Sequence, residues 1–147
     1  MLIINIEITY YIRSISLQYN GKLINQISSY QNYKYKSITM MIKKIMSNND
    51  YKNKKLSAIT ITKNPGSFTG LKIGTSIAKG ICYIINIPLI SINTLKSIIY
   101  YINNKNKKLL CPIIDTKKIN LYYTLLNNKL LTIEKIKKKN KKKIKNK

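Results

Sequence analysis

KNPGSFTGLKIG, which runs from Lys63 to Gly74, joins an apolar strand-like run to a helical one. Its glycines, Gly66, Gly70 and Gly74, are spaced four residues apart. A Walker A loop needs a lysine directly after its second glycine, and Leu71 stands there instead. The dinucleotide-binding pattern G-x-G-x-x-G is also absent. The start of a helix still offers free backbone N–H groups, so anion binding by this loop stays open as an alternative.

The same glycines predict a ridge of small residues on the helix that follows. Gly70, Gly74 and Ala78 stand at successive i, i+4 positions, so they line one side of a helix over residues 68–85. A glycine inside a helix costs about 1 kcal/mol relative to alanine, and close packing of another backbone can offset that cost. We expect the ridge to meet either the helix of residues 37–47 or a helix from a partner. The helix's own sheet should then contact the larger side chains, namely Ile73, Ile77, Ile81 and Ile84.

The runs around this helix predict an α/β fold. Asn20-Gly21 between two alternating apolar runs indicates a hairpin, so the chain should open as a three-stranded antiparallel meander. Apolar residues then fall at helical spacing over 37–47, with Ser37 as N-cap. Ser67 or Thr69 is expected to cap the second helix, and Asn93 the third. The expected strands are 2–8, 11–18, 22–29, 56–62, 88–92, 109–116, 119–126 and 129–135, and the third helix is 93–102.

The net charge of +24 has two explanations. A charge of this size favours a polyanion as partner, and twelve tyrosines could add base stacking, so a basic RNA-binding accessory protein is one alternative. However, Ile, Asn and Lys, whose codons are A/T-rich, make up 75 of the 147 residues, so compositional drift explains the lysines as well. Residues 135–147 are rich in lysine and poor in apolar residues, and we expect a disordered tail.

Several kinds of chemistry are disfavoured by what the chain contains. It has no histidine, which removes Ser–His and Cys–His dyads, and we expect no catalytic, cofactor or metal site. Cys82 and Cys111 form neither a disulfide framework nor a zinc site, and their apolar neighbours predict buried thiols. Glu7, Thr9 and Asp115 would form the site of a small phosphotransferase, the remaining enzymatic alternative. Without a signal peptide or a bilayer-spanning run, we expect a cytoplasmic protein and no membrane partner.

Residues 64–81, NPGSFTGLKIGTSIAKGI, strongly resemble the signature of the bacterial TsaB (YeaZ-like) proteins, G-P-G-S-F-T-G-[LV]-R-I-G followed by a helix. IPLISINTL at 87–95 and IDTKKINLYY at 114–123 are similar to two further segments of that family. The resemblance covers about residues 1–126. The chain departs from the family pattern at Glu7 for Asp, Asn64 for Gly, Lys117 for Arg and Asn120 for Glu.

The resemblance implies an actin/Hsp70/sugar-kinase-like (ASKHA) lobe with a mixed five-stranded sheet and helices over 1–103. A truncated second lobe of strands over 104–134 and the tail 135–147 would follow. It further implies a non-catalytic scaffold subunit of the machinery that makes N6-threonylcarbamoyladenosine (t6A) at position 37 of tRNA. The implied partners are a TsaD-type catalytic subunit in a heterodimer, a TsaE-type ATPase, and tRNA through the complex, with a homodimer as an open alternative.

In that family, pairing uses the two helices of the first lobe. The expected interface residues here are therefore Met41, Ile45, Gly70, Gly74, Ile77 and Ala78. The loop that starts the second helix comprises Pro65, Gly66, Ser67, Phe68 and Thr69.

Overall fold

The computed structural model forms two compact units, Met1–Ile92 and Asn93–Lys147. The boundary expected at 103/104 therefore lies about ten residues too late. Ile99 explains the difference, because this helix residue is buried against strand residues Leu110 and Leu126 of the second unit. The structure describes residues 1–8, 12–30, 38–47, 51, 54–100, 109–115, 120–127 and 132–140.

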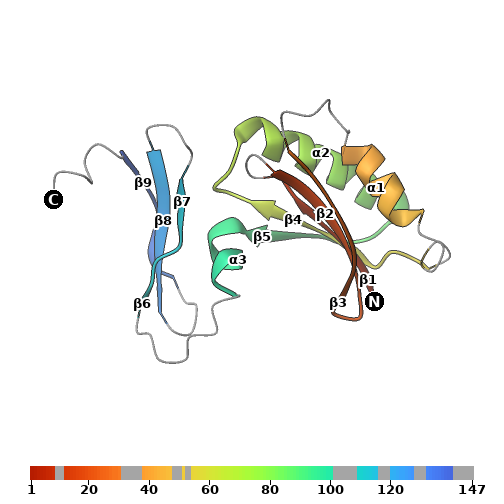
Figure 1. Ribbon diagram of the computed structural model, residues 1–147, viewed down its shortest axis with the longest axis horizontal. Coiled ribbons are helices and arrows are strands. Elements are labelled where there is room, and N and C mark those ends of the chain that lie inside the picture. The colour runs from red at the N-terminus through yellow and green to blue at the C-terminus, as the bar shows by residue number, and fades with distance from the viewer. Residues whose placement is uncertain are drawn as a thin grey trace. The chain divides into compact units, whose positions relative to one another are not determined.

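A mixed five-stranded sheet forms the centre of the first unit, as expected (Figure 1). Its strand order is β3-β2-β1-β4-β5, with β1 antiparallel to β2 and parallel to β4. The hairpin between β2 and β3 turns at Asn20 and Gly21, whose φ angles of 47° and 82° fit the predicted turn. The strands are β1 (Leu2–Glu7), β2 (Ile12–Tyr19), β3 (Lys22–Tyr30), β4 (Ala58–Lys63) and β5 (Leu89–Asn93).

Two helices, α1 (Ile38–Met46) and α2 (Phe68–Ile85), pack on one face of this sheet (Figure 1). Alternate residues of β1 point towards them and are buried in a shared apolar core. Ser67 caps α2 by accepting a hydrogen bond from the backbone N–H of Gly70 at 3.4 Å. At the other end Asn86 adopts a left-handed conformation that stops the helix. The bounds of α2 are those that the sequence predicts.

The opposite face of the sheet carries a ladder of polar side chains. Thr60 Oγ1 donates to Asn5 Oδ1 at 2.7 Å, and Asn5 Nδ2 donates to Ser16 Oγ at 3.2 Å. These hydrogen bonds link three neighbouring strands, β4, β1 and β2. Among the described residues, the main apolar cluster of the first unit therefore lies on the helical side of the sheet.

The described part of the second unit comprises a four-stranded sheet and one helix. Strand β8 pairs antiparallel with β6, β7 and β9, and Ile99 of α3 packs on Leu110 and Leu126. Asn93 caps α3 as predicted, since its Oδ1 accepts from the backbone N–H groups of Leu95 and Lys96. The elements are α3 (Thr94–Tyr100), β6 (Leu109–Leu110), β7 (Ile113–Asp115), β8 (Asn120–Asn127) and β9 (Thr132–Asn140).

Two expectations for the second unit are wrong. The strand expected over 109–116 is two short strands, because Cys111 and Pro112 interrupt it and proline has no N–H to donate. The disordered tail expected from residue 135 begins with a strand instead, since β9 pairs with β8 as far as Asn140. Main-chain pairing orders this segment despite its few apolar side chains. Residues 141–147 of the expected tail lie outside the described residues.

Candidate functional site

The ridge of small residues on α2 faces the sheet, so the expectation that it meets another helix is wrong. Gly70, Gly74 and Ala78 are buried. A Cβ at Gly70 would lie 2.7 Å from the backbone oxygen of Ile8, and a Cβ at Gly74 would lie 2.5 Å from Ile8 Cδ1. Ile8, which follows β1, fills the space that larger side chains on the ridge would need. These small residues let α2 approach its own sheet.

The two residues expected to form the interface from α1 are also inside the unit. Met41 and Ile45 are 1% and 0% exposed and belong to the apolar core. With only nine residues, α1 covers the sheet by burying four of its apolar side chains, so these two cannot reach a partner. Ile77 of α2 is half-buried at the edge of the core and stays a candidate.

Several large apolar residues of α2, by contrast, point away from the sheet. Ile73 and Ile84, which were expected against the sheet, are 47% and 80% exposed. Tyr83 is 89% exposed and Phe68 is 72% exposed, so both are more open than Ile73. Exposed apolar side chains gathered on one element mark an interaction surface. Ile77 and Ile81, which were also expected against the sheet, do pack against the core, so the expectation is wrong for Ile73, Ile84 and the glycine ridge.

Four residues define what we call the outer face of α2: Ile73, Ile77, Gly80 and Ile84. They stand at i, i+4, i+7 and i+11, so helical periodicity places them in one stripe. Gly80 is exposed, and a Cβ there would meet no atom of the described structure within 4 Å. Gly80 therefore lowers the stability of the helix as any interior glycine does. Unlike Gly70, it allows no close packing within the described structure.

A largely apolar groove of about 670 Å³ opens between α1 and α2. Ile42 and Met46 line it from α1, and Ile81 and Ile85 line it from α2. Lys55 contributes the charged group of its lining. The groove and the outer face of α2 share one helix, so the two helices together present both a projecting apolar stripe and a recess.

The loop that starts α2 caps the helix. Pro65 is buried, whereas Phe68 and Thr69 are exposed. Ser67 accepts from Gly70 and thereby satisfies one free N–H group of the first turn. Lys72 Nζ lies 4.2 Å from the centre of the Phe68 ring, a cation–π contact on the surface.

Comparison with known proteins identifies the family. The family model described as TsaD, tRNA N6-adenosine threonylcarbamoyltransferase, matches residues 28–144. The chain belongs to the TsaD family. Within that family it is TsaB-like, because its curated relatives include several proteins named "tRNA threonylcarbamoyladenosine biosynthesis protein TsaB".

The TsaB of Bacillus subtilis is 25% identical over 139 residues, which cover 92% of this chain and 59% of that protein. The TsaB of Haemophilus influenzae is 33% identical over 84 residues, 56% of this chain and 35% of that protein. The solved structure of YeaZ from Pseudomonas aeruginosa superposes with a TM-score of 0.73 at 12% identity, covering 93% of this chain and 66% of that one. This similarity confirms the ASKHA-like α/β fold. The chain spans between about a third and three-fifths of the length of these curated relatives.

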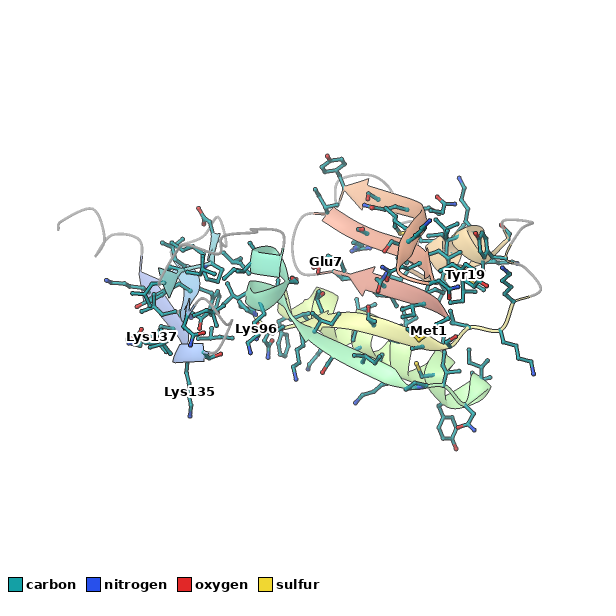
Figure 2. All side chains as sticks on the ribbon, turned by 90° about the horizontal axis from the view of Figure 1, so that it is seen from below. Met1, Glu7, Tyr19, Lys96, Lys135 and Lys137 are labelled. Carbon is teal, nitrogen blue, oxygen red and sulfur yellow. The ribbon has the colours of Figure 1, made fainter. Side chains whose placement is uncertain are left out.

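Two acidic residues of this TsaB-like chain end strands. Glu7 ends β1 in the first unit (Figure 2), and Asp115 ends β7 in the second. Thr9, the third residue of the phosphotransferase alternative, lies outside the described residues. No helix in the described ranges is both long and apolar enough to span a membrane.

The two cysteines differ, contrary to expectation. Cys82 is buried on α2 as predicted, and burial raises the pKa of its thiol. Cys111 is exposed, because it lies in the break between β6 and β7.

We therefore expect thiol labelling near neutral pH to separate them. A disulfide reagent should modify Cys111 rapidly and Cys82 only on unfolding, because the raised pKa leaves less thiolate and the core blocks access. The rates can be read from single Cys→Ser variants by absorbance. Equal rates for both thiols in the native protein would contradict the packing of α2.

Gly80→Ala should stabilise this TsaB-like chain by up to about 1 kcal/mol, since alanine is the better helix former and the new methyl meets open space. Urea unfolding followed by circular dichroism measures the change. A loss of stability would show that the outer face of α2 is packed against something within the chain.

Proposed function

We propose that the chain is a non-catalytic subunit of the t6A machinery, and that it binds a TsaD-type catalytic subunit through the exposed surface of α1 and α2. The observation that carries the proposal is the outer face of α2, where Ile73 and Ile84 are exposed beside half-buried Ile77. Family membership supplies the class of partner, because the names of the matching proteins refer to the making of threonylcarbamoyladenosine.

The chemistry of the surface suits a helix from another protein. Gly80 leaves a gap in the apolar stripe through which a partner backbone could come close. The groove beside Ile81 and Ile85 could receive one projecting apolar side chain. Lys43 on α1 and Lys79 on α2 are exposed, and their positive charge favours a partner with acidic residues.

The residue content supports a scaffold rather than a catalyst. The chain has no histidine and only four acidic residues. Of these, Glu7 and Asp115 belong to different units. We propose that catalysis lies in the partner, and that a TsaE-type ATPase and tRNA join through the cytoplasmic complex rather than through a catalytic site or cofactor on this chain.

Reconstitution tests the proposal. The chain would be co-expressed with the TsaD-type subunit of the same genome, and the pair examined by size-exclusion chromatography and by t6A formation on a tRNA transcript. We expect co-elution, and t6A formation that requires both proteins. A chain that elutes alone and adds nothing to t6A formation would overturn the proposal. A homodimer that persists in the presence of the TsaD-type subunit would also overturn it.

A further inference from the structure

Lysine is concentrated in the second unit. Residues 93–147 contain 16 lysines against two acids, Asp115 and Glu134, whereas residues 1–92 contain 11 lysines in a longer stretch. A codon bias acts on both units alike, yet lysine density more than doubles while that of isoleucine falls, from 21 residues in the first unit to nine in the second. Compositional drift alone therefore does not explain where the lysines are.

Strand β9 arranges part of this charge along one edge of the sheet. Lys135, Lys137, Lys138 and Lys139 are exposed on it, and Figure 2 shows Lys135 and Lys137 projecting from this strand. Glu134 forms an ion pair with Lys137 at 3.0 Å, and this contact raises the pKa of Lys137. Among the described residues, the other three lysines have no carboxylate partner.

Aromatic side chains lie directly across from these lysines. In the β8–β9 register, Tyr123 pairs with Lys137 and Tyr122 with Lys138. Both tyrosines are half-buried, so each keeps part of its ring accessible. Successive residues of a strand point to opposite faces, so each face of this edge carries lysine next to tyrosine.

We propose that the edge formed by β9 and the tyrosines of β8 binds the sugar-phosphate backbone of RNA. The identification of this RNA as tRNA rests on the proposed function. Lys135, Lys137 and Lys139 recur at every second residue of an extended strand, which suits a polymer of regularly spaced phosphates, and adjacent tyrosines can contact its bases or sugars. The surface would bring tRNA to the complex without carrying out chemistry.

Protection of a sheet edge does not account for this pattern. Lysine does protect exposed strand edges, but a run of like charges on one short strand repels itself, which edge protection alone does not require. An anionic membrane is the less favoured partner, because surface binding typically uses an amphipathic helix with large apolar residues opposite its lysines. On β9 the lysines occur on both faces.

Fluorescence anisotropy with a labelled tRNA transcript tests the proposal on the full chain alone, between about 50 and 200 mM salt. The test variant carries Lys135→Gln, Lys138→Gln and Lys139→Gln, which leaves the Glu134–Lys137 pair intact. The control removes the same charge from the first unit through Lys22→Gln, Lys44→Gln and Lys54→Gln, all exposed. A third variant replaces the three β9 lysines by arginine and so keeps the charge.

We expect the β9 glutamine variant to bind more than about tenfold more weakly at low salt, with a log K against log salt slope smaller by about 2 to 2.7. The control and arginine variants should stay near wild type. Equal losses in the β9 and control variants, an unchanged slope, or binding to phosphatidylglycerol vesicles but not to RNA would overturn the proposal. Binding to tRNA that depends on β9, in a chain that does not pair with the TsaD-type subunit, would support the surface and refute the proposed function.

Discussion

Gly70→Ala is expected to lower the free energy of unfolding by about 3 kcal/mol. The new Cβ would lie 2.7 Å from the backbone oxygen of Ile8, and a backbone atom cannot rotate away as a side chain can. Either α2 or the end of β1 must shift, which disturbs the apolar core between them. Since small domains are stable by only about 5–15 kcal/mol, this loss is a large fraction of the total.

Urea unfolding of three glycine-to-alanine variants shows whether the loss of stability comes from the contact with Ile8. At Gly74 the nearest atom is the tip of the Ile8 side chain, so Gly74→Ala should cost less than Gly70→Ala. Gly80→Ala serves as the control, because it adds the same methyl to the same helix in open space. A Gly70→Ala variant as stable as the wild type would show that the ridge does not pack against Ile8.

Much of the fold could be predicted because local signals decide it. Asn20-Gly21 specifies a hairpin through backbone conformations that few other residues adopt, and the structure has both residues at positive φ. Ser67 and Asn93 are caps whose side chains accept the hydrogen bonds that the first turns of α2 and α3 need. Such features depend on residues close in sequence, so they can be recognised without tertiary structure.

The orientation of α2 could not be predicted by the same means. Both of its candidate faces are apolar, and hydrophobicity alone favours burying Ile73 and Ile84 rather than the glycines. The outcome depends on the strand below, where Ile8 and other branched residues already fill the space, so only small residues fit opposite them. That information lies more than fifty residues away in the sequence.

The order of β9 was missed for a related reason. A lysine-rich segment with few apolar residues is typical of a disordered tail. Pairing with β8 is decided by main-chain hydrogen bonds and by neighbours such as Thr124, whose Oγ1 donates to the backbone oxygen of Glu134 at 2.5 Å. The amino-acid composition of the segment reveals neither the main-chain pairing nor the contact with Thr124.

Ile84→Asp is expected to weaken binding to the TsaD-type subunit by about 2 kcal/mol or more, roughly 30-fold in Kd. Ile84 is 80% exposed, so a carboxylate there leaves the isolated chain folded. In a heterodimer that covers the outer face of α2, the same carboxylate would be buried against apolar side chains without a partner, which is costly. Leu23→Asp is the matched control, since Leu23 is 61% exposed and belongs to β3 rather than to either helix.

Isothermal titration calorimetry of the TsaD-type subunit against wild type, Ile84→Asp and Leu23→Asp tests the central claim most directly. If the outer face of α2 is the partner surface, Leu23→Asp binds like the wild type, and Ile84→Asp binds about 30-fold more weakly or not measurably. If Ile84→Asp is folded and binds with the wild-type Kd, the catalytic subunit docks elsewhere and the exposed apolar stripe has another role.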